Sequence, residues 1–557
     1  MSHKRTISSF SLLLTSISAI LGSGWLFSAY YAAIYAGYGS ILAWILGGIM
    51  VIIVAFVFAE VGAMIPITGF SVRVPHFTHG SLVSFVFAWI VWLTYQTLGP
   101  TEVQAMIQYL GVYYPSLLGP SAQLTSSGIL LATILLLIIT IINTFSMRWF
   151  IKINNMITAI KIIIPLIVSI TLIAYYCLHI HSHNSILIQH IPLSPTGFSG
   201  IFAAIASGGV IFAFNAFKSA AEMGGESQNP KRALPLAIIG SVLICMIIYL
   251  LVQIAFLLSL SPDNLSHGWN NLNLNASFGP LAAVAYQNKL SILAPIIFIG
   301  AIVGPFAAGL IYVGSAARSL YGMSQNEHIP KLFNILTGQG NPIFGIIIYF
   351  FLGILMFAPF KGWSSMVTFL TSLLAITYAI MPICHYVMRK KLPHRKRPFR
   401  LPFGKCWALI AFYACTLMIY WSGWSVISKL GLVIISGLAT LFLYSIFGYQ
   451  GRTFQWSLKQ SIWLWVYLIG ITLLSYLGHY GHGKNLLPGY LICFLFFLLC
   501  SITFFLANYF SLSPVVMEKE IEQVLNAGQT HSNQDNEDFE LVHSSSFQES
   551  FEPNKPE

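Results

Sequence analysis

Three small residues interrupt an apolar stretch near the start of the chain and could free backbone groups for binding. Gly22, Ser23 and Gly24 stand within "ISAILGSGWLFSAYYAAIYAG", and three poor helix formers in succession favour a break in a helix. Inside a bilayer, the freed N–H and C=O groups each cost several kcal/mol unless they find a partner. The N–H groups at such a break can bind a carboxylate, so the sequence predicts an anion-binding site here.

A second apolar stretch, "SGGVIFAFNAFKSAAEMGGES", is interrupted in the same way by two glycines and then by Asn215. The carbonyl groups freed between Phe212 and Asn215 are suited to an ammonium group. A zwitterionic ligand, with one carboxylate and one ammonium group, would satisfy both breaks at once. The alternative is that the two stretches are glycine-containing kinks that serve helix packing.

A lysine and an acid follow the second break. Lys218 and Glu222 have the i, i+4 spacing of one helix face. If a half-helix begins near Phe217, Lys218 lies in its first turn, where the helix dipole disfavours a cation. Such a cation calls for an anionic partner. Glu222 in an internal ion pair, a substrate carboxylate, or both can fill that role.

Charged residues also occur deep within the apolar runs, where they are costly and usually mark paths of ions, protons or substrates. Glu60, Glu102 and Lys161 are in this position. Lys161 lies in "NNMITAIKIIIPLIV" with no acid within one helical turn. A lysine removed from water gives up its proton more readily, which makes Lys161 a candidate proton carrier. The alternative is a lysine whose side chain extends to the cytoplasmic surface.

The elements that position these residues are expected to be membrane helices. Hydrophobic residues make up 57% of the 557 residues and charged residues 8%, whereas soluble domains carry roughly 25% charged residues. The basic residues lie in short loops between apolar runs, which is a signal of membrane topology and not of nucleic-acid binding. The sequence contains no nucleotide motif and no cluster of nucleophiles, paired acids or metal ligands. It therefore argues against an enzyme and against a metal centre.

The apolar runs predict an all-α polytopic membrane protein with about 14 transmembrane helices, since each run is long enough to cross a bilayer of about 30 Å. The runs are residues 10–37, 41–66, 81–114, 127–145, 150–177, 200–224, 233–260, 290–324, 342–359, 364–388, 404–425, 430–448, 460–478 and 487–510.

The lysines and arginines predict which side of the membrane each loop faces. Most of them, including those of "RKKLPHRKRPFRLPFGK", fall on one side of the alternating segments, so both termini are expected in the cytoplasm. The opposite side holds Lys289, Lys361, Lys429 and Lys484. The expected divisions are a cytoplasmic N-terminus (1–9), a ten-helix core (10–388), a basic cytoplasmic loop (389–403), additional C-terminal helices (404–510) and a cytoplasmic tail (511–557).

Three segments are not expected to cross the membrane. The loop at 178–199 carries four histidines on the external side, where a His-x-His-x-His pattern could bind a transition metal, although a solvated loop is the simpler interpretation. Residues 69–80 are too short to cross and are expected to be interfacial or re-entrant. The tail from 511 on holds 10 acidic and 2 basic residues, and this polar composition predicts disorder.

Several motifs resemble the amino acid–polyamine–organocation (APC) permeases. "GSGWLF" resembles the glycine-rich break of that family's first span, and "FAFNAFKSAAEMGGESQNPKRALP" resembles its sixth span and the following loop. "GSAARSLYGMSQNEHIPKLF" and "RPFRLP" resemble later segments. "EVGAMIPITGFSVRVPH" and "GPTEVQAMIQY" are most similar to a bacterial and archaeal branch that includes proposed aspartate–proton symporters. The resemblance covers residues 10–425, and the ordered set is more specific than any single motif.

The resemblance implies a core of two inverted five-helix repeats, with discontinuous helices 1 and 6, and further helices at the end. It also implies alternating access around an amino acid site at the middle of the membrane. By position, Gly22, Ser23 and Gly24 would hold the substrate carboxylate. The carbonyl groups and an aromatic lid would come from Phe212, Ala213, Phe214 and Asn215.

Three further positions follow from the resemblance. Lys161 matches the fifth-span lysine that takes the place of a sodium ion in proton-coupled members, and Tyr312 is a weaker candidate for a gating aromatic residue. Lys218 departs from the family, because relatives often carry an acid or a neutral polar residue there. A lysine near the substrate argues against cationic substrates and is compatible with acidic ones.

The expected function is proton-coupled uptake of an acidic or small neutral amino acid across the cytoplasmic (inner) membrane. The alternative is an amino acid exchanger without obligatory proton coupling. The expected partners are the amino acid and the lipid bilayer, with no nucleic acid. No cofactor is expected beyond the coupling proton, and the sequence does not indicate an oligomeric state.

Overall fold

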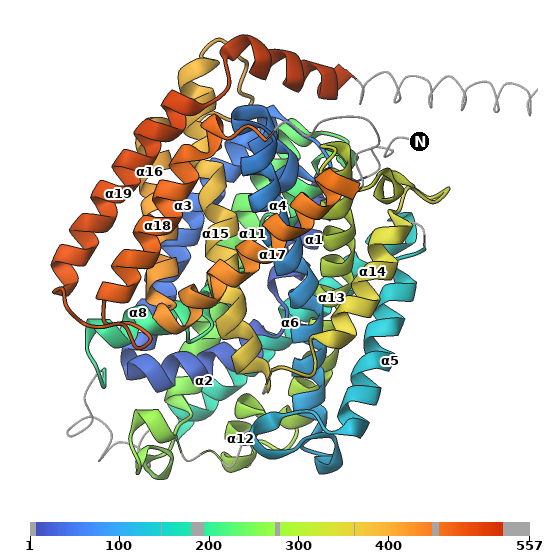
Figure 1. Ribbon diagram of the computed structural model, residues 1–557. Helices are drawn as coiled ribbons and strands as arrows, with labels where there is room; N and C mark the ends of the chain where they lie inside the picture. The colour runs from blue at the N-terminus through green and yellow to red at the C-terminus, as the bar shows by residue number, and fades with distance from the viewer. Residues whose placement is uncertain are drawn as a thin grey trace, which may run out of the picture.

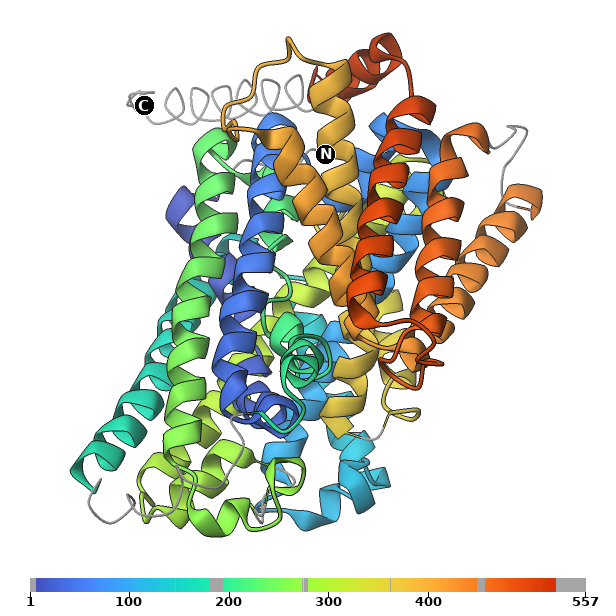
Figure 2. The same cartoon turned by 90° about the vertical axis from the view of Figure 1, so that its left-hand side faces the viewer.

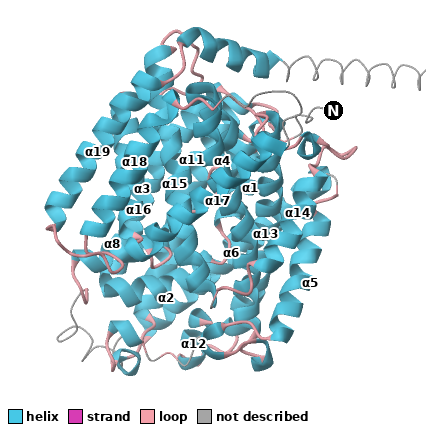
Figure 3. Cartoon of the chain, in the orientation of Figure 1, coloured by secondary structure: helices cyan, strands magenta, loops and turns pink. Residues whose placement is uncertain are grey.

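The computed structural model describes residues 7–145, 147–179, 194–272, 274, 279–360, 362–447 and 456–526, without the side chains of residues 121 and 147–152. Within this part of the chain, all extended regular structure is helical (Figure 3). Ten helices in it are long and apolar enough to cross a membrane. The prediction of an all-α membrane protein is confirmed.

The first group of helices contains one interrupted span. It comprises α1 (Ser9–Ile20), α2 (Gly24–Ala36), α3 (Ser40–Met64), α4 (Phe70–Leu110), α5 (Ser126–Ile142) and α6 (Met147–Leu178).

The second group repeats this plan, again with an interrupted first span. It comprises α8 (Phe198–Ala206), α9 (Val210–Ala213), α10 (Ser219–Glu222), α11 (Pro230–Leu258), α13 (Leu293–Gln325), α14 (Ile343–Leu355) and α15 (Gly362–Lys391), with the short α12 (Pro280–Gln287) before α13.

Helices at equivalent places in the two groups lie against each other. The second spans, α3 and α11, are in contact, and so are the third spans, α4 and α13. The interrupted helices lie among these long helices, which run in a common direction (Figure 1). Four later helices gather on one side of the bundle (Figure 2): α16 (Gly404–Trp421), α17 (Trp424–Phe447), α18 (Ile462–Leu477) and α19 (Gly489–Phe510).

Each of the fourteen predicted runs corresponds to a helix or to an interrupted helix. Ten long helices have the length and hydropathy of a membrane span, while four further apolar segments are shorter. The count of fourteen spans therefore stays a prediction. α11 follows Asn229 and begins at Pro230, three residues before the predicted apolar run 233–260. The Asn229 side chain makes no capping hydrogen bond, however.

Two expectations about the segments outside the spans need correction. Residues 70–79 are a mostly buried helix that continues into the third span across a non-helical Gly80, at φ 76°. Residues 514–526 are helical rather than disordered, with Met517 and Ile521 fully buried. The rest of the predicted disordered tail and three of the histidines in the 178–199 loop lie outside the described residues.

Candidate functional site

The first predicted break is present between α1 and α2. α1 ends at Ile20 and α2 begins at Gly24. Gly24 lies directly against the second break, because a Cβ added there would be 2.9 Å from the Ala213 Cα. A glycine is therefore required at this position for the two breaks to meet.

The second predicted break lies between α9 and α10. The backbone leaves the helix after Ala213, and Ala216 adopts a left-handed conformation with φ 62°. Asn215 folds back, so that its Nδ2 donates to the Phe212 carbonyl at 2.7 Å. One of the carbonyl groups predicted for an ammonium ligand is thus already paired with a side chain.

Two tyrosines from the scaffold meet the freed carbonyl groups. The Tyr249 hydroxyl, on α11, lies 2.8 Å from the Ile20 carbonyl and 2.9 Å from the Ala213 carbonyl. The Tyr312 hydroxyl, on α13, lies 2.6 Å from the Ala19 carbonyl and 2.8 Å from Asn215 Oδ1. Each tyrosine therefore contacts both breaks. Tyr312, predicted as a gating residue, lies at the junction itself, and its gating role stays a prediction.

A carboxylate from α4 fills the first break. Glu102 Oε2 accepts a hydrogen bond from the Ser23 N–H at 2.7 Å. The same carboxylate lies beside Gly22, where an added Cβ would overlap with Glu102 Oε1. The N–H group that was predicted to hold a substrate carboxylate thus holds a carboxylate of the protein.

Lys161 lies on the other side of the first break. Its Nζ donates to the Ser18 carbonyl at 2.5 Å and to the Ser18 hydroxyl at 3.2 Å. A cation is favourable here because Ser18 is in the last turn of α1, at the negative end of the helix dipole. The Lys161 side chain is buried and interacts electrostatically with Glu102. It does not extend to the surface, which was the alternative to a role inside the protein.

Lys218 directly precedes α10 and is completely buried. Its Nζ makes no hydrogen bond and lies over the Tyr95 and Tyr378 rings, at 5.1 and 5.6 Å from their centroids. Glu222 interacts with it electrostatically, but Glu222 Oε2 accepts from the Ser71 N–H at 3.3 Å. The predicted internal pair is thus not a hydrogen-bonded one. Glu222 Oε1 is likewise buried without a hydrogen bond.

Side chains close the site at both ends. At one end, Trp363 Nε1 donates to the Ser23 hydroxyl at 2.7 Å, and its ring stacks on Phe27 with centroids 4.8 Å apart. At the other end, Arg318 Nε pairs with Glu226 at 2.8 Å. The residues of both breaks are buried between these two contacts.

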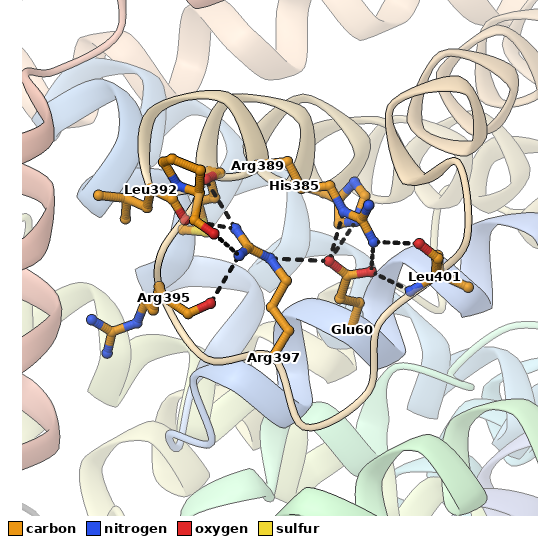
Figure 4. Close-up of polar contacts among 9 residues, drawn as sticks. Glu60, His385, Arg389, Leu392, Arg395, Arg397 and Leu401 are labelled. Carbon is orange, nitrogen blue, oxygen red and sulfur yellow. Dashed lines mark hydrogen bonds and ion pairs between the residues drawn. The ribbon is translucent and has the colours of Figure 1, made fainter.

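Glu60, one of the intramembrane acids, does not join this site. It lies beside the end of α15, where it accepts from Arg389 Nε at 2.8 Å and from the Leu401 N–H at 2.8 Å, and pairs with Arg397 at 3.3 Å (Figure 4). These contacts anchor the basic loop 389–403. The interpretation of Glu60 as part of an ion or substrate path is therefore not supported, and its role in the structure is to fix this loop.

The sequence comparisons identify the family. The model of the amino acid permease family matches residues 7–429. The chain belongs to this family. The permease is 31% identical over 86% of its length to the glutamate/serine transporter AimA of Bacillus subtilis, covering 88% of that protein. It is 31% identical over 87% of its length to the aspartate-proton symporter of the same organism, covering 92% of it. These relatives are transporters and not enzymes.

Among solved structures, the permease is similar to Mhp1, a nucleobase-cation-symport-1 family transporter in a closed conformation with bromovinylhydantoin bound. The TM-score is 0.47 and the identity 14%, over 79% of this chain and 91% of that one.

Sequence reasoning missed two residues of the permease site and did not place a third, Glu102, in it. Tyr249 and Trp363 carry no local signal, because each lies in an apolar helix among many other aromatic residues. Glu102 did carry a signal as an intramembrane acid, but the sequence could not indicate that its carboxylate reaches Ser23.

Proposed function

We propose that this permease is a secondary active transporter that takes up an acidic or small neutral amino acid together with a proton. The single observation that carries this proposal is the junction of two helix breaks, where Gly24 meets Ala213. Backbone donors of one break and backbone acceptors of the other lie in one buried place, which matches the two charged groups of an amino acid.

The acidic preference rests on Lys218. An unpaired ammonium group in a buried position is costly, and a bound carboxylate would offset that cost. Lys218 Nζ has no hydrogen-bond partner and interacts electrostatically with Glu222, whose Oε1 also has none. A side-chain carboxylate of aspartate or glutamate fits this chemistry. Two relatives named for glutamate/serine transport and aspartate–proton symport agree with this preference.

Proton coupling rests on Lys161. Its ammonium group stabilises the last turn of α1 through Ser18, as a bound cation would. Lys161 also interacts electrostatically with Glu102, so protonation of this buried pair is linked to the contact between α6 and α1 and to the position of a half-helix. An exchanger without proton coupling is the alternative, and it has no need of a titrating pair at this place.

We propose that the chain lies in the cytoplasmic membrane with both termini in the cytoplasm. The basic loop 389–403 and the helix at 514–526 lie at one end of the bundle, joined by the pair of Arg395 and Glu518. The α12–α13 connection, which carries Lys289, lies at the other end (Figure 1). This distribution agrees with the orientation that the basic residues predict.

The test is uptake of radiolabelled aspartate, glutamate, alanine and arginine into proteoliposomes, with and without an inward proton gradient. Gradient-driven uptake that is lost in Lys161→Ala supports the coupling. A loss of acidic substrates in Lys218→Ala of about 10- to 100-fold, which corresponds to one charge-assisted hydrogen bond, supports the substrate class. The exposed Lys289→Ala is the matched control. Uptake that requires internal amino acid and ignores the gradient would refute the symporter and support the exchanger.

A further inference from the structure

The Glu102 carboxylate occupies the place where a substrate carboxylate would bind. Its Oε2 accepts a hydrogen bond from the N–H of Ser23, at the start of the 13-residue α2. Its Oε1 is buried without any hydrogen bond. The start of a helix attracts negative charge, because its N–H groups are unpaired and its dipole is positive there. One of the permease's own carboxylates thus lies in a position suited to a carboxylate ligand.

We propose that the α-carboxylate of the substrate displaces Glu102 from Ser23, and that Glu102 binds the coupling proton when this happens. This inference rests on the proposed transport of an amino acid and deepens it by naming the atom that carries the proton. Lys161 then acts through Glu102, because its positive charge favours the ionised form of the Glu102 carboxylate.

The physical argument is a competition between two carboxylates. Both cannot be ionised side by side in a buried place, since like charges disfavour each other and burial disfavours each of them. The substrate carboxylate gains the Ser23 N–H, and Glu102 loses its hydrogen bond to that group. An ionised Glu102 with no donor would be strongly destabilised, so it is neutralised by one proton from solution.

The proton balance of the cycle is complete. Glu102 gains one proton as the substrate binds, and Lys161 remains an ammonium group on Ser18. When the substrate leaves on the other side, Glu102 releases that proton there and its carboxylate returns to Ser23. One proton is thus carried with each substrate.

The other ionisable groups that face this pair do not supply an alternative anion. Glu102 interacts electrostatically with Lys161 on α6 and with three tyrosines that are neutral in a buried site. Lys161 interacts in turn with Glu102 and with a buried thiol. The groups are Tyr249 and Cys245 on α11, Tyr312 on α13 and Tyr349 on α14.

The experiment counts the protons taken up when the purified full-length permease binds L-glutamate or L-serine. Calorimetric titrations in buffers of different ionisation enthalpy measure that number. We expect about one proton per ligand for the wild type and none for Glu102→Gln, which keeps an oxygen acceptor for Ser23 but cannot ionise. We also expect the wild-type Kd to rise up to about tenfold per pH unit above neutrality, and the Glu102→Gln Kd to stay flat.

Two control variants keep the result interpretable. Thr101→Val removes a buried hydroxyl one residue away that donates within its own helix to the Thr97 carbonyl at 2.9 Å, and it should keep the wild-type proton count. Glu102→Asp retains the ionisable group and should also keep it, with weaker binding. If Glu102→Gln does not fold, Lys161→Arg, which keeps a cation that cannot release a proton, provides the test: a count of one proton supports the proposal, and a count of zero assigns the proton to Lys161 and overturns it.

The outcomes separate this inference from the proposed function. A wild type that binds ligand without proton uptake, or a Glu102→Gln protein that takes up one proton, overturns the role of Glu102 and leaves amino acid transport intact. A wild type that binds and transports none of the amino acids overturns the proposed function, and the inference with it.

Discussion

The contacts of Glu60 with Arg389 and Arg397 give the most direct test of how the basic loop 389–403 is anchored. The proposed change is Glu60→Gln, which removes the negative charge and keeps the size of the side chain. In the structure Glu60 is 1% exposed, and the paired arginines, Arg389 and Arg397, are 11% and 7% exposed. Removing one partner of a buried ion pair costs about 3–5 kcal/mol, because the other charge is left without compensation.

The expected effect is local opening of the loop between α15 and α16. A loss of about 3 kcal/mol raises the open population by roughly 100-fold, and proteolysis follows that population when reclosing is fast. Trypsin cleavage after the exposed Lys396, followed by mass spectrometry of the folded protein in detergent, should therefore accelerate by about 100-fold or more.

The matched control is Glu518→Gln, which breaks the pair between Arg395 and Glu518 in a place where the Glu518 side chain is 38% exposed. Exposed ion pairs contribute about 0–1 kcal/mol, so cleavage should accelerate by less than about fivefold. Equal cleavage rates in the wild type and Glu60→Gln would refute the assignment of Glu60 as the anchor of the loop.

Three further predictions follow from other contacts. Gly24→Ala should separate the two breaks, since the new Cβ would lie 2.9 Å from the Ala213 Cα; we expect uptake to fall at least tenfold with normal amounts of protein in the membrane, and normal uptake would contradict the required close approach. Arg318→Gln should weaken the closure formed with Glu226 at 2.8 Å and increase labelling of a cysteine placed at Ser315; unchanged labelling would contradict the assignment of this pair as a closure. Burial holds the pKa of His328, in the loop after α13, well below its usual value of 6.5. Folding therefore favours the neutral imidazole, and the free energy of unfolding should fall as pH drops below 6.5, by up to about 1.4 kcal/mol per pH unit. Thermal unfolding between pH 5 and 8 should depend less on pH in His328→Gln than in the wild type.

The helix breaks could be predicted from the sequence because their cause is local. Glycine at positions 22 and 24 lowers helix stability wherever it stands, and the same holds for the glycines before Val210. The groups that satisfy these breaks could not be predicted, since they come from distant helices. Tyr249 lies 229 residues after Ile20, and Glu102 lies 79 residues after Ser23.

Charge alone was a less reliable guide to the site. Glu60 and Glu102 have the same sequence signature, an acid inside an apolar run. One anchors a loop at the end of α15, and the other fills the first break. The difference depends on which groups each acid faces once α3 and α4 have packed against the other helices. Hydropathy does not contain that information.

The two contacts of the Tyr249 hydroxyl tie the two breaks together. This hydroxyl lies 2.8 Å from the Ile20 carbonyl and 2.9 Å from the Ala213 carbonyl. The Ile20 carbonyl also accepts from the Gly22 N–H at 2.8 Å, so the single Tyr249 hydrogen can go to Ala213 without leaving Ile20 unpaired. Separation of the two half-helices must therefore break a contact of Tyr249, which makes this side chain a clasp between the two repeats.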